Sequence, residues 1–424
     1  MSGNFPFGFT PPDPDKPGGD PTGGFDMSQL GSALESLGRM LQSGGTGPVN
    51  WDLASQIAKQ HEAQQSDPEL TAGERSAVAD AAMLADHWLD GACSFAASDA
   101  GAVAWTRREW VDGTLPTWQE VITPVAEQVQ GTLGGLIAGQ AMPGMDEQAT
   151  AMMGPLAGMA KQLGAALFAA QVGQGLGTLS GEVLSASDIG IPLTRSGRPT
   201  ILPGNAGQFA DGLGLDRQDV LLYVALRECA HERLFTHVPW LRSRLEAAVA
   251  AYARGIHVDT DRIEQAVAQI DPANPESMQE VLSGGVLEPQ DTPEQRAALS
   301  RLETLLAMVE GWVEHVVTEA VADRMPDLGR LSEAMRRRRA AGGPAEKTFA
   351  TLVGLELRPR RLREAAQFWG MVLTAEDAAG RDALWEHPDL LPAADDLDDI
   401  DGYWERRQSS EPLQVPEDPE ASAE

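Results

Sequence analysis

Apolar residues recur at helical spacing through the N-terminal half of the chain. The segments that show this spacing are 28–43, 51–64, 71–91, 116–139 and 147–178. Thr71 and Glu74 stand at the spacing of a capping box, in which each side chain satisfies a free amide at the start of a helix. The many Gly, Ala and Met residues favour close contact between helices. We therefore expect this half of the protein to be helical.

Two long helices are also predicted in the second half, over about 216–238 and 293–320. Pro239 follows the first of them, and proline cannot continue a helix because it lacks an amide hydrogen. Thr292 is a typical N-cap for the second, and Pro293 suits the first helical position. These two helices carry the candidate chemistry.

The pattern of apolar and polar residues changes between the two halves, over residues 189–204. Two short apolar runs flank the polar sequence Arg-Ser-Gly-Arg, which is typical of a turn. This segment predicts a small β-hairpin. The expected fold class is mainly α with this minor β-hairpin.

Charge and composition narrow the functional classes. The chain has 63 acidic and 32 basic residues and a formal charge of −31, so its surface would repel a phosphate backbone or an anionic membrane. No nucleic-acid partner is expected. The run Arg336 to Arg339 is interpreted as a solvated helix end rather than a docking patch. No phosphate-binding loop or serine nucleophile elbow occurs, so no nucleotide cofactor is implied.

Several features favour a cytoplasmic protein. The N-terminus has no basic and apolar regions of a signal peptide, and two cysteines are too few for a disulfide framework. The uncharged stretch 162–181 is diluted by Gln, Gly and Ser, so we expect no membrane span. Residues 1–27 and the acidic tail 409–424 are expected to be disordered, leaving one domain over 28–408. Oligomeric state is left open.

The sequence with most chemical content is Arg227-Glu228-Cys-Ala-His231 in the first of the two long helices. Positions 227 and 231 lie on one helix face because they are four residues apart. In zincins this spacing is H-E-x-x-H, in which two histidines hold zinc and the glutamate accepts a proton from water. Taken alone, an R-E-x-x-H is a weak signal, because all three residue types are common on helix surfaces.

The longer string around this motif resembles a zincin-like metallopeptidase family that is common in actinobacteria. That family has H-E-x-x-H-x-x-x-F-x-x-V-P-W-L at this helix and E-G-x-x-D/E-x-V at a later one. The positions of this chain that match are Glu228, His231, Phe235, Val238, Pro239, Trp240, Leu241, Glu310, Gly311, Glu314 and Val316. The resemblance spans most of the chain and implies a divergent zincin-like helical fold.

The resemblance also implies a zinc site and a peptide or protein substrate. Glu228 would be the general base, His231 and Glu310 metal ligands, and Glu314 a carboxylate that orients a histidine. Glu310 and Glu314 lie one turn apart and therefore share a helix face. Without the resemblance, this carboxylate pair would be interpreted as a solvated helix flank.

Arg227 departs from the family pattern, because a guanidinium cannot ligate a cation. Two alternatives follow. In one, zinc is retained by substitute ligands, with His237 as a candidate because it follows His231 at the spacing of a third zincin histidine. In the other, Arg227 pairs with Glu310 and Glu314, and the protein is a catalytically degenerate zincin that acts as a binding or scaffold module.

Overall fold

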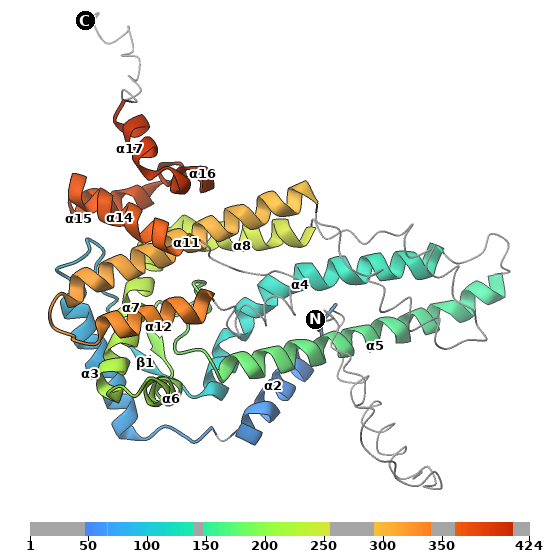
Figure 1. The fold of residues 1–424 in the computed structure, drawn as a ribbon. Helices are drawn as coiled ribbons and strands as arrows, with labels where there is room; N and C mark the ends of the chain where they lie inside the picture. The colour runs from blue at the N-terminus through green and yellow to red at the C-terminus, as the bar shows by residue number, and fades with distance from the viewer. Residues whose placement is uncertain (1–46, 66, 140–146, 255–291, 341–360, 410–424) are drawn as a thin grey trace, which may run out of the picture.

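The computed structural model describes residues 47–65, 67–139, 147–254, 292–340 and 361–409. Its fold is mainly helical, as predicted (Figure 1). The α-helices are α2 (Trp51–Gln65), α3 (Ala72–Leu89), α4 (Arg107–Gly139), α5 (Glu147–Ser180), α6 (Pro203–Leu213), α7 (Arg217–His237), α8 (Pro239–Arg254), α11 (Pro293–Val321), α12 (Leu328–Ala340), α14 (Leu362–Glu376), α15 (Ala378–Ala383), α16 (Ala394–Asp398) and α17 (Ile400–Ser409). Two 3-10 turns, Leu384–Glu386 and Pro388–Leu390, join α15 to α16. The predictions for 1–43 and for the tail beyond residue 409 lie outside the described residues.

Capping residues place the helix starts. Thr71 caps α3 in the predicted capping box with Glu74, and Thr292 caps α11 with Pro293 at its first position. α4 begins at Arg107, earlier than the predicted residue 116. The reason is a further reciprocal cap, in which the Glu109 amide donates to the Thr106 hydroxyl and the Thr106 amide to the Glu109 carboxylate.

α7 is the central helix of the fold. Residues on all of its faces are buried between Val220 and Leu234, and it packs against α3, α6 and α11 (Figure 1). Because the buried set includes charged side chains, their partners must come from inside the protein. α7 ends at His237 as Pro239 predicts, and Pro239 then starts α8, which lies beside α11.

The predicted hairpin over 189–204 is wrong in its pairing. Within the described ranges, the sheet consists of β1 (Val103–Ala104) and β2 (Thr200–Ile201), and the two strands are parallel. Ser185 adds one antiparallel bridge to Ile201. The first apolar run, around Ile191, is buried without forming a strand. A strand partner so distant in sequence leaves no local signal.

Small residues bring α5 against α2, as the composition suggested. A side chain at Gly173 would meet the Ala54 carbonyl oxygen at 2.6 Å, and one at Gly177 would meet His61 Cβ at 2.8 Å. Substitution at either glycine would therefore separate the two helices. Among the described helices, none is long and apolar enough to cross a membrane.

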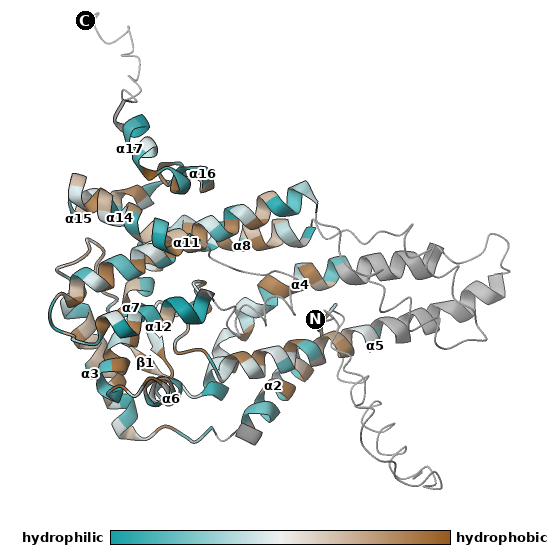
Figure 2. Cartoon of the chain, viewed as in Figure 1, coloured by the Kyte–Doolittle hydropathy of each residue, from teal (hydrophilic) through white to brown (hydrophobic). Residues whose placement is uncertain are grey.

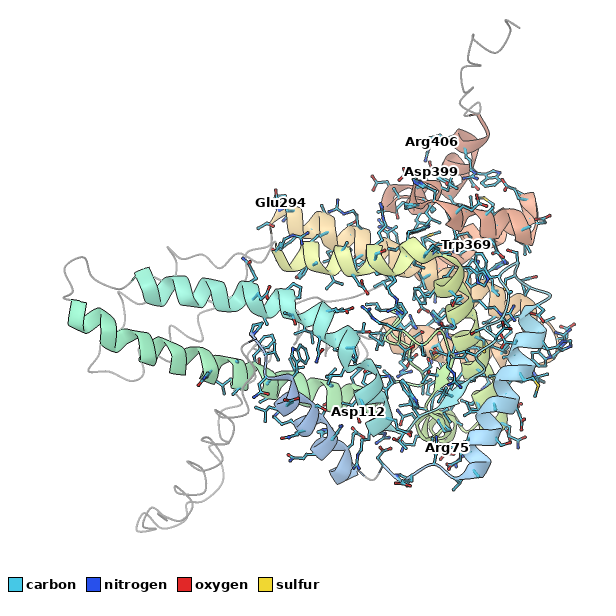
Figure 3. The ribbon with its side chains drawn as sticks, turned by 180° about the vertical axis from the view of Figure 1, so that it is seen from behind. Arg75, Asp112, Glu294, Trp369, Asp399 and Arg406 are labelled. Atoms are coloured by element: carbon cyan, nitrogen blue, oxygen red, sulfur yellow. The ribbon has the colours of Figure 1, made fainter. Side chains whose placement is uncertain are left out.

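The C-terminal helices pack onto α11 through buried tryptophans. The Trp369 indole of α14 donates to the Met308 carbonyl oxygen at 2.9 Å, where α14 meets α11 (Figure 3). The Trp312 indole of α11 donates to Asp382 at 2.9 Å. Further out, Arg406 and Asp399 form an exposed ion pair (Figure 3). The C-terminal helices thus hold α11, and with it Glu310, in place.

Candidate functional site

The predicted site residues Arg227, His231 and Glu310 lie together where α7 faces α11. Arg227 Nη2 is 2.6 Å from Glu310 Oε2, and His231 Nε2 is 3.0 Å from Glu310 Oε1. All three are buried, with exposed fractions of 7%, 1% and 2%. The structure therefore contains the Arg227–Glu310 ion pair of the second alternative. The Glu314 carboxylate, which that alternative also assigned to Arg227, is bound by Arg336 instead.

A fourth residue, Arg339 at the end of α12, completes this group. Its Nη1 lies 2.6 Å from Glu310 Oε1. Arg227, His231, Glu310 and Arg339 are called the Glu310 cluster below. Both oxygens of the Glu310 carboxylate are thus engaged by charged or ring nitrogen donors.

The charges within the Glu310 cluster keep Glu310 and Arg227 in their ionised forms. Burial alone would raise the pKa of Glu310, but the charges of Arg339, His231 and Arg227 hold it well below its usual range. Burial opposes the charge on Arg227, yet the neighbouring Tyr223 and Glu310 hold the Arg227 pKa above its usual range. The cluster is therefore an ionised, buried network.

His231 has a hydrogen-bond acceptor beside each of its ring nitrogens. Its Nδ1 is 2.9 Å from the Arg227 carbonyl oxygen, and its Nε2 faces the Glu310 carboxylate. A carbonyl oxygen and an ionised carboxylate can only accept hydrogen bonds. A metal ligand needs a free lone pair on one of the ring nitrogens.

Glu228 is bound by backbone amides and not by residues of the Glu310 cluster. Its two carboxylate oxygens accept hydrogen bonds from the Ser187 amide at 3.2 Å and the Thr200 amide at 3.1 Å. Burial raises the pKa of Glu228 to about 8, against the lowering effect of these bonds and of Ser185. Glu228 therefore joins α7 to β2 and to the loop before it.

The arginine run at the end of α12 corrects an interpretation from sequence. Arg336 pairs with Glu314 at 2.9 Å, and Arg338 pairs with Asp188 at 2.9 Å and also donates to the Glu182 carbonyl oxygen. Only Arg337 is solvated within this run, with 78% of its side chain exposed. Figure 2 shows this strongly hydrophilic helix end.

The composition of the run by itself favours solvation, because it does not show which acidic side chains lie opposite. Four adjacent arginines in a chain with twice as many acidic as basic residues were the available signal. Their buried acidic partners depend on the packing of α12, which the sequence pattern did not supply.

The other two predicted site residues have separate partners. Glu314 binds Arg336. His237 stacks on Phe95 with ring centroids 5.2 Å apart, and its Nδ1 lies 2.8 Å from the Arg233 carbonyl oxygen. Six residues along a continuous helix, His237 is rotated by about 240° from His231. The structure does not bring it to Glu310.

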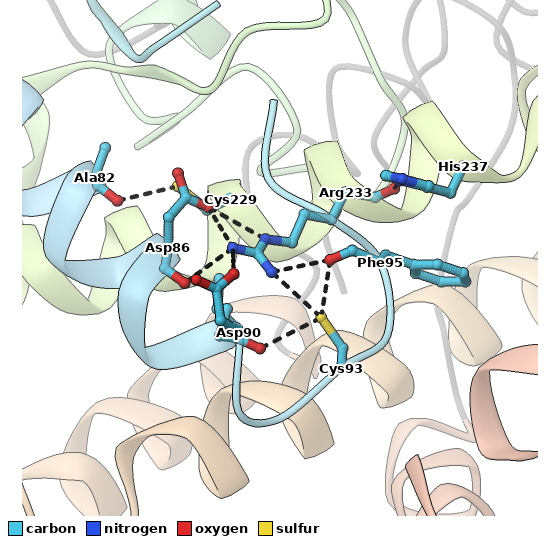
Figure 4. A network of polar contacts seen from close by, with 9 residues as sticks. Ala82, Asp86, Asp90, Cys93, Phe95, Cys229, Arg233 and His237 are labelled. Carbon is cyan, nitrogen blue, oxygen red and sulfur yellow. Dashed lines mark hydrogen bonds and ion pairs between the residues drawn. The ribbon is translucent and has the colours of Figure 1, made fainter. Parts of the chain in front are cut away.

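A second polar group on α7 surrounds Arg233 (Figure 4). Its guanidinium binds Asp86 at 3.0 Å, Asp90 at 2.8 Å and the Phe95 carbonyl oxygen at 2.9 Å. Asp86, Asp90 and Arg233 are called the Arg233 cluster. Both cysteines lie beside it as buried thiols, and burial raises the pKa of each. This cluster ties α7 to α3.

The donor set of the Glu310 cluster does not fit zinc. Among the described residues, no group of three or more His, Cys, Asp or Glu side chains is placed to hold a metal ion. Around Glu310, two guanidinium groups occupy the directions from which a cation would approach. Guanidinium groups cannot ligate and would repel a cation.

Comparison with known proteins agrees with the motif resemblance. The family model described as "Zincin-like metallopeptidase" matches residues 49–404. The chain belongs to this family. A search of curated proteins finds no match.

A solved structure shares the fold of this zincin-like chain. It is the crystal structure of a candidate hydrolase, described as having a novel fold, from Chloroflexus aurantiacus. The TM-score is 0.60 at 20% sequence identity, over 86% of this chain and 100% of that one. At this identity the likeness extends to the fold alone.

Proposed function

We propose that this chain is a zincin-like family member in which metal-dependent hydrolysis is lost and binding of a partner protein or peptide is the function. The observation that carries the proposal is the Arg227–Glu310 contact of 2.6 Å. In the family pattern position 227 is a metal-ligating histidine, whereas here a guanidinium binds the carboxylate assigned as the third ligand. Arg227 thus takes the electrostatic place of a metal.

The arrangement of Glu228 supports the same proposal. A general base must reach the proton that it accepts, within hydrogen-bond distance or through one water. Glu228 is 1% exposed and its oxygens are occupied by two backbone amides. Its chemical role is then to hold β2 against α7, which preserves the scaffold without the reaction.

The charge of the chain favours a partner with basic segments. Because the formal charge of the chain is −31, electrostatic attraction would speed its encounter with a basic partner. Added salt would weaken this attraction. Calorimetry with a lysine-rich and a glutamate-rich peptide of equal length tests this preference. Equal affinity for both would contradict it.

A second candidate is the activity that the family name carries, zinc-dependent hydrolysis of peptide or amide bonds. His231 and Glu310 remain neighbours, 3.0 Å apart, and the chain belongs to the family. In this reading His231 and Glu310 bind zinc, with His237 or water as a further ligand and Glu228 as the base.

Elemental analysis of the untagged protein separates the two candidates. If the protein is a degenerate zincin, it should contain no stoichiometric zinc. It should also show no peptidase activity that increases with added zinc or disappears with a chelator. About one zinc per chain, lost in His231→Ala but kept in His387→Ala, would establish the second candidate instead. His387 is a suitable control because its side chain is 63% exposed.

A further inference from the structure

Arg339 contributes to the Glu310 cluster from outside both motif helices. It lies in the last turn of α12, 29 residues after Glu310. Its Nη1 reaches Glu310 Oε1 at 2.6 Å, while its Nη2 donates to the Asp188 carbonyl oxygen at 2.6 Å. One guanidinium therefore bridges α11 and the loop before β2.

Adjacent contacts fix the position of this helix end. Arg338 binds the Asp188 carboxylate at 2.9 Å, and Arg336 binds Glu314 one turn after Glu310 at 2.9 Å. Leu331 and Met335 anchor the apolar side of α12 in the core. Arg339 is thus directed at Glu310 by the ion pairs of the preceding Arg336 and Arg338 and by the apolar packing of α12.

The loop on the far side closes around the same carboxylate oxygen. Gly190 has a φ of +78°, and a side chain at this position would lie 3.0 Å from Glu310 Oε1. Glycine permits both this conformation and the close approach. Glu310 Oε1 is therefore enclosed by His231, Arg339 and the Gly190 backbone.

We infer that Arg339 is a second, independent barrier to metal binding, and that α12 blocks the family metal position even when Arg227 is replaced by histidine. This inference rests on the proposed function. A cation at the site would meet the Arg339 charge on the Glu310 oxygen that it needs, so restoring the missing histidine leaves the ligand set incomplete. Metal uptake requires both guanidinium groups to be removed.

The test compares zinc binding in four chains: wild type, Arg227→His, Arg339→Met and the double variant Arg227→His/Arg339→Met. Methionine retains much of the arginine stem volume without its charge. Elemental analysis and calorimetry with zinc should detect about one zinc per chain only in the double variant. Its affinity should exceed that of Arg227→His by at least about tenfold.

A matched control is Arg337→Met combined with Arg227→His. Arg337 belongs to the same helix end but is exposed and binds Glu333. This control should behave like Arg227→His. Should the first double variant fail to fold by circular dichroism and gel filtration, Arg227→His/Arg339→Gln replaces it and retains donors for Glu310 and Asp188.

The outcomes separate the inference from the proposal on which it rests. Zinc bound by Arg227→His as tightly as by the folded double variant would overturn the role of Arg339 while leaving the proposed function intact. A folded double variant that binds no zinc would also overturn the inference. Stoichiometric zinc in the wild type would overturn the proposed function itself.

Discussion

The Glu310 and Arg233 clusters lie on the same helix and use the same chemistry in different surroundings. Arg227 and Arg233 each bind carboxylates at 3.0 Å or less. Glu310 is 2% exposed, whereas the side chains of Asp86 and Asp90 are 26% and 61% exposed. The Arg233 side chain is itself 1% exposed, but water can reach its carboxylate partners, whereas it cannot reach Glu310. Ion pairs of similar length are therefore expected to contribute unequal free energies to folding.

The largest expected loss of stability comes from replacing Glu310, the buried carboxylate of the Glu310 cluster. Glu310→Gln should lower the free energy of unfolding by about 3–5 kcal/mol, because it leaves Arg227 and Arg339 without a buried counter-charge. Urea denaturation measures the change, with the exposed Arg337→Ala as control. A loss under about 1 kcal/mol would show that the cluster is solvated and that the contrast with Arg233 is mistaken.

The stabilisation that Glu310 provides should decrease as the pH falls. The pKa of Glu310 is lowered in the folded protein, so its contribution is present above its unfolded pKa and is lost as the pH falls toward the folded value. The stability difference between wild type and Glu310→Gln should therefore narrow below about pH 4.5. A difference that stays constant into strong acid would contradict an ionised Glu310.

Glu228 provides a contrast with Glu310, because both are buried but the hydrogen bonds of Glu228 include no cationic partner. Its pKa is raised from 4.5 to about 8, chiefly by burial. Between these values the unfolded chain loses a proton that the folded protein keeps, so stability falls as the pH rises. The slope contributed by Glu228 should approach about 1.4 kcal/mol per pH unit.

Glu228→Gln should remove that slope, since glutamine does not titrate in this range. Denaturation of wild type and Glu228→Gln between about pH 5 and pH 8 measures the difference. Parallel curves would mean that Glu228 keeps an ordinary pKa, and a Glu228 that ionises freely would support its assignment as a base.

The smallest effect is expected in the exposed part of the Arg233 cluster. Asp90→Ala should change stability by about 1 kcal/mol or less, because Arg233 retains Asp86 and the Phe95 carbonyl oxygen. Thermal denaturation alongside Glu310→Gln gives the comparison directly. A loss as large as that of Glu310→Gln would remove the distinction between the two clusters.

Three of the residues singled out from the sequence are neighbours in the structure, and one of their contacts, Arg227 with Glu310, was among the predicted alternatives. The helix spacing and the family resemblance placed Arg227, His231 and Glu310 together, and the repulsive chemistry of Arg227 raised the ion-pair alternative. The sequence did not predict that Glu228 binds the backbone amides of Ser187 and Thr200, or that Arg339 binds Glu310. Both depend on which distant backbone or carboxylate lies opposite, and neither leaves a periodic pattern.

The sequence by itself determined the boundaries of several helices and pointed to the family. Thr71, Thr292 and Pro293 set helix starts, and Pro239 ended α7, because capping and proline effects act within a few residues of the chain. Only the tertiary structure decided that β2 pairs with β1 and that α12 delivers Arg339 to Glu310. Helix packing determines which strand pairs with β2 and which cation reaches Glu310. It brings together residues that are far apart in the sequence, so no local sequence pattern predicts these contacts.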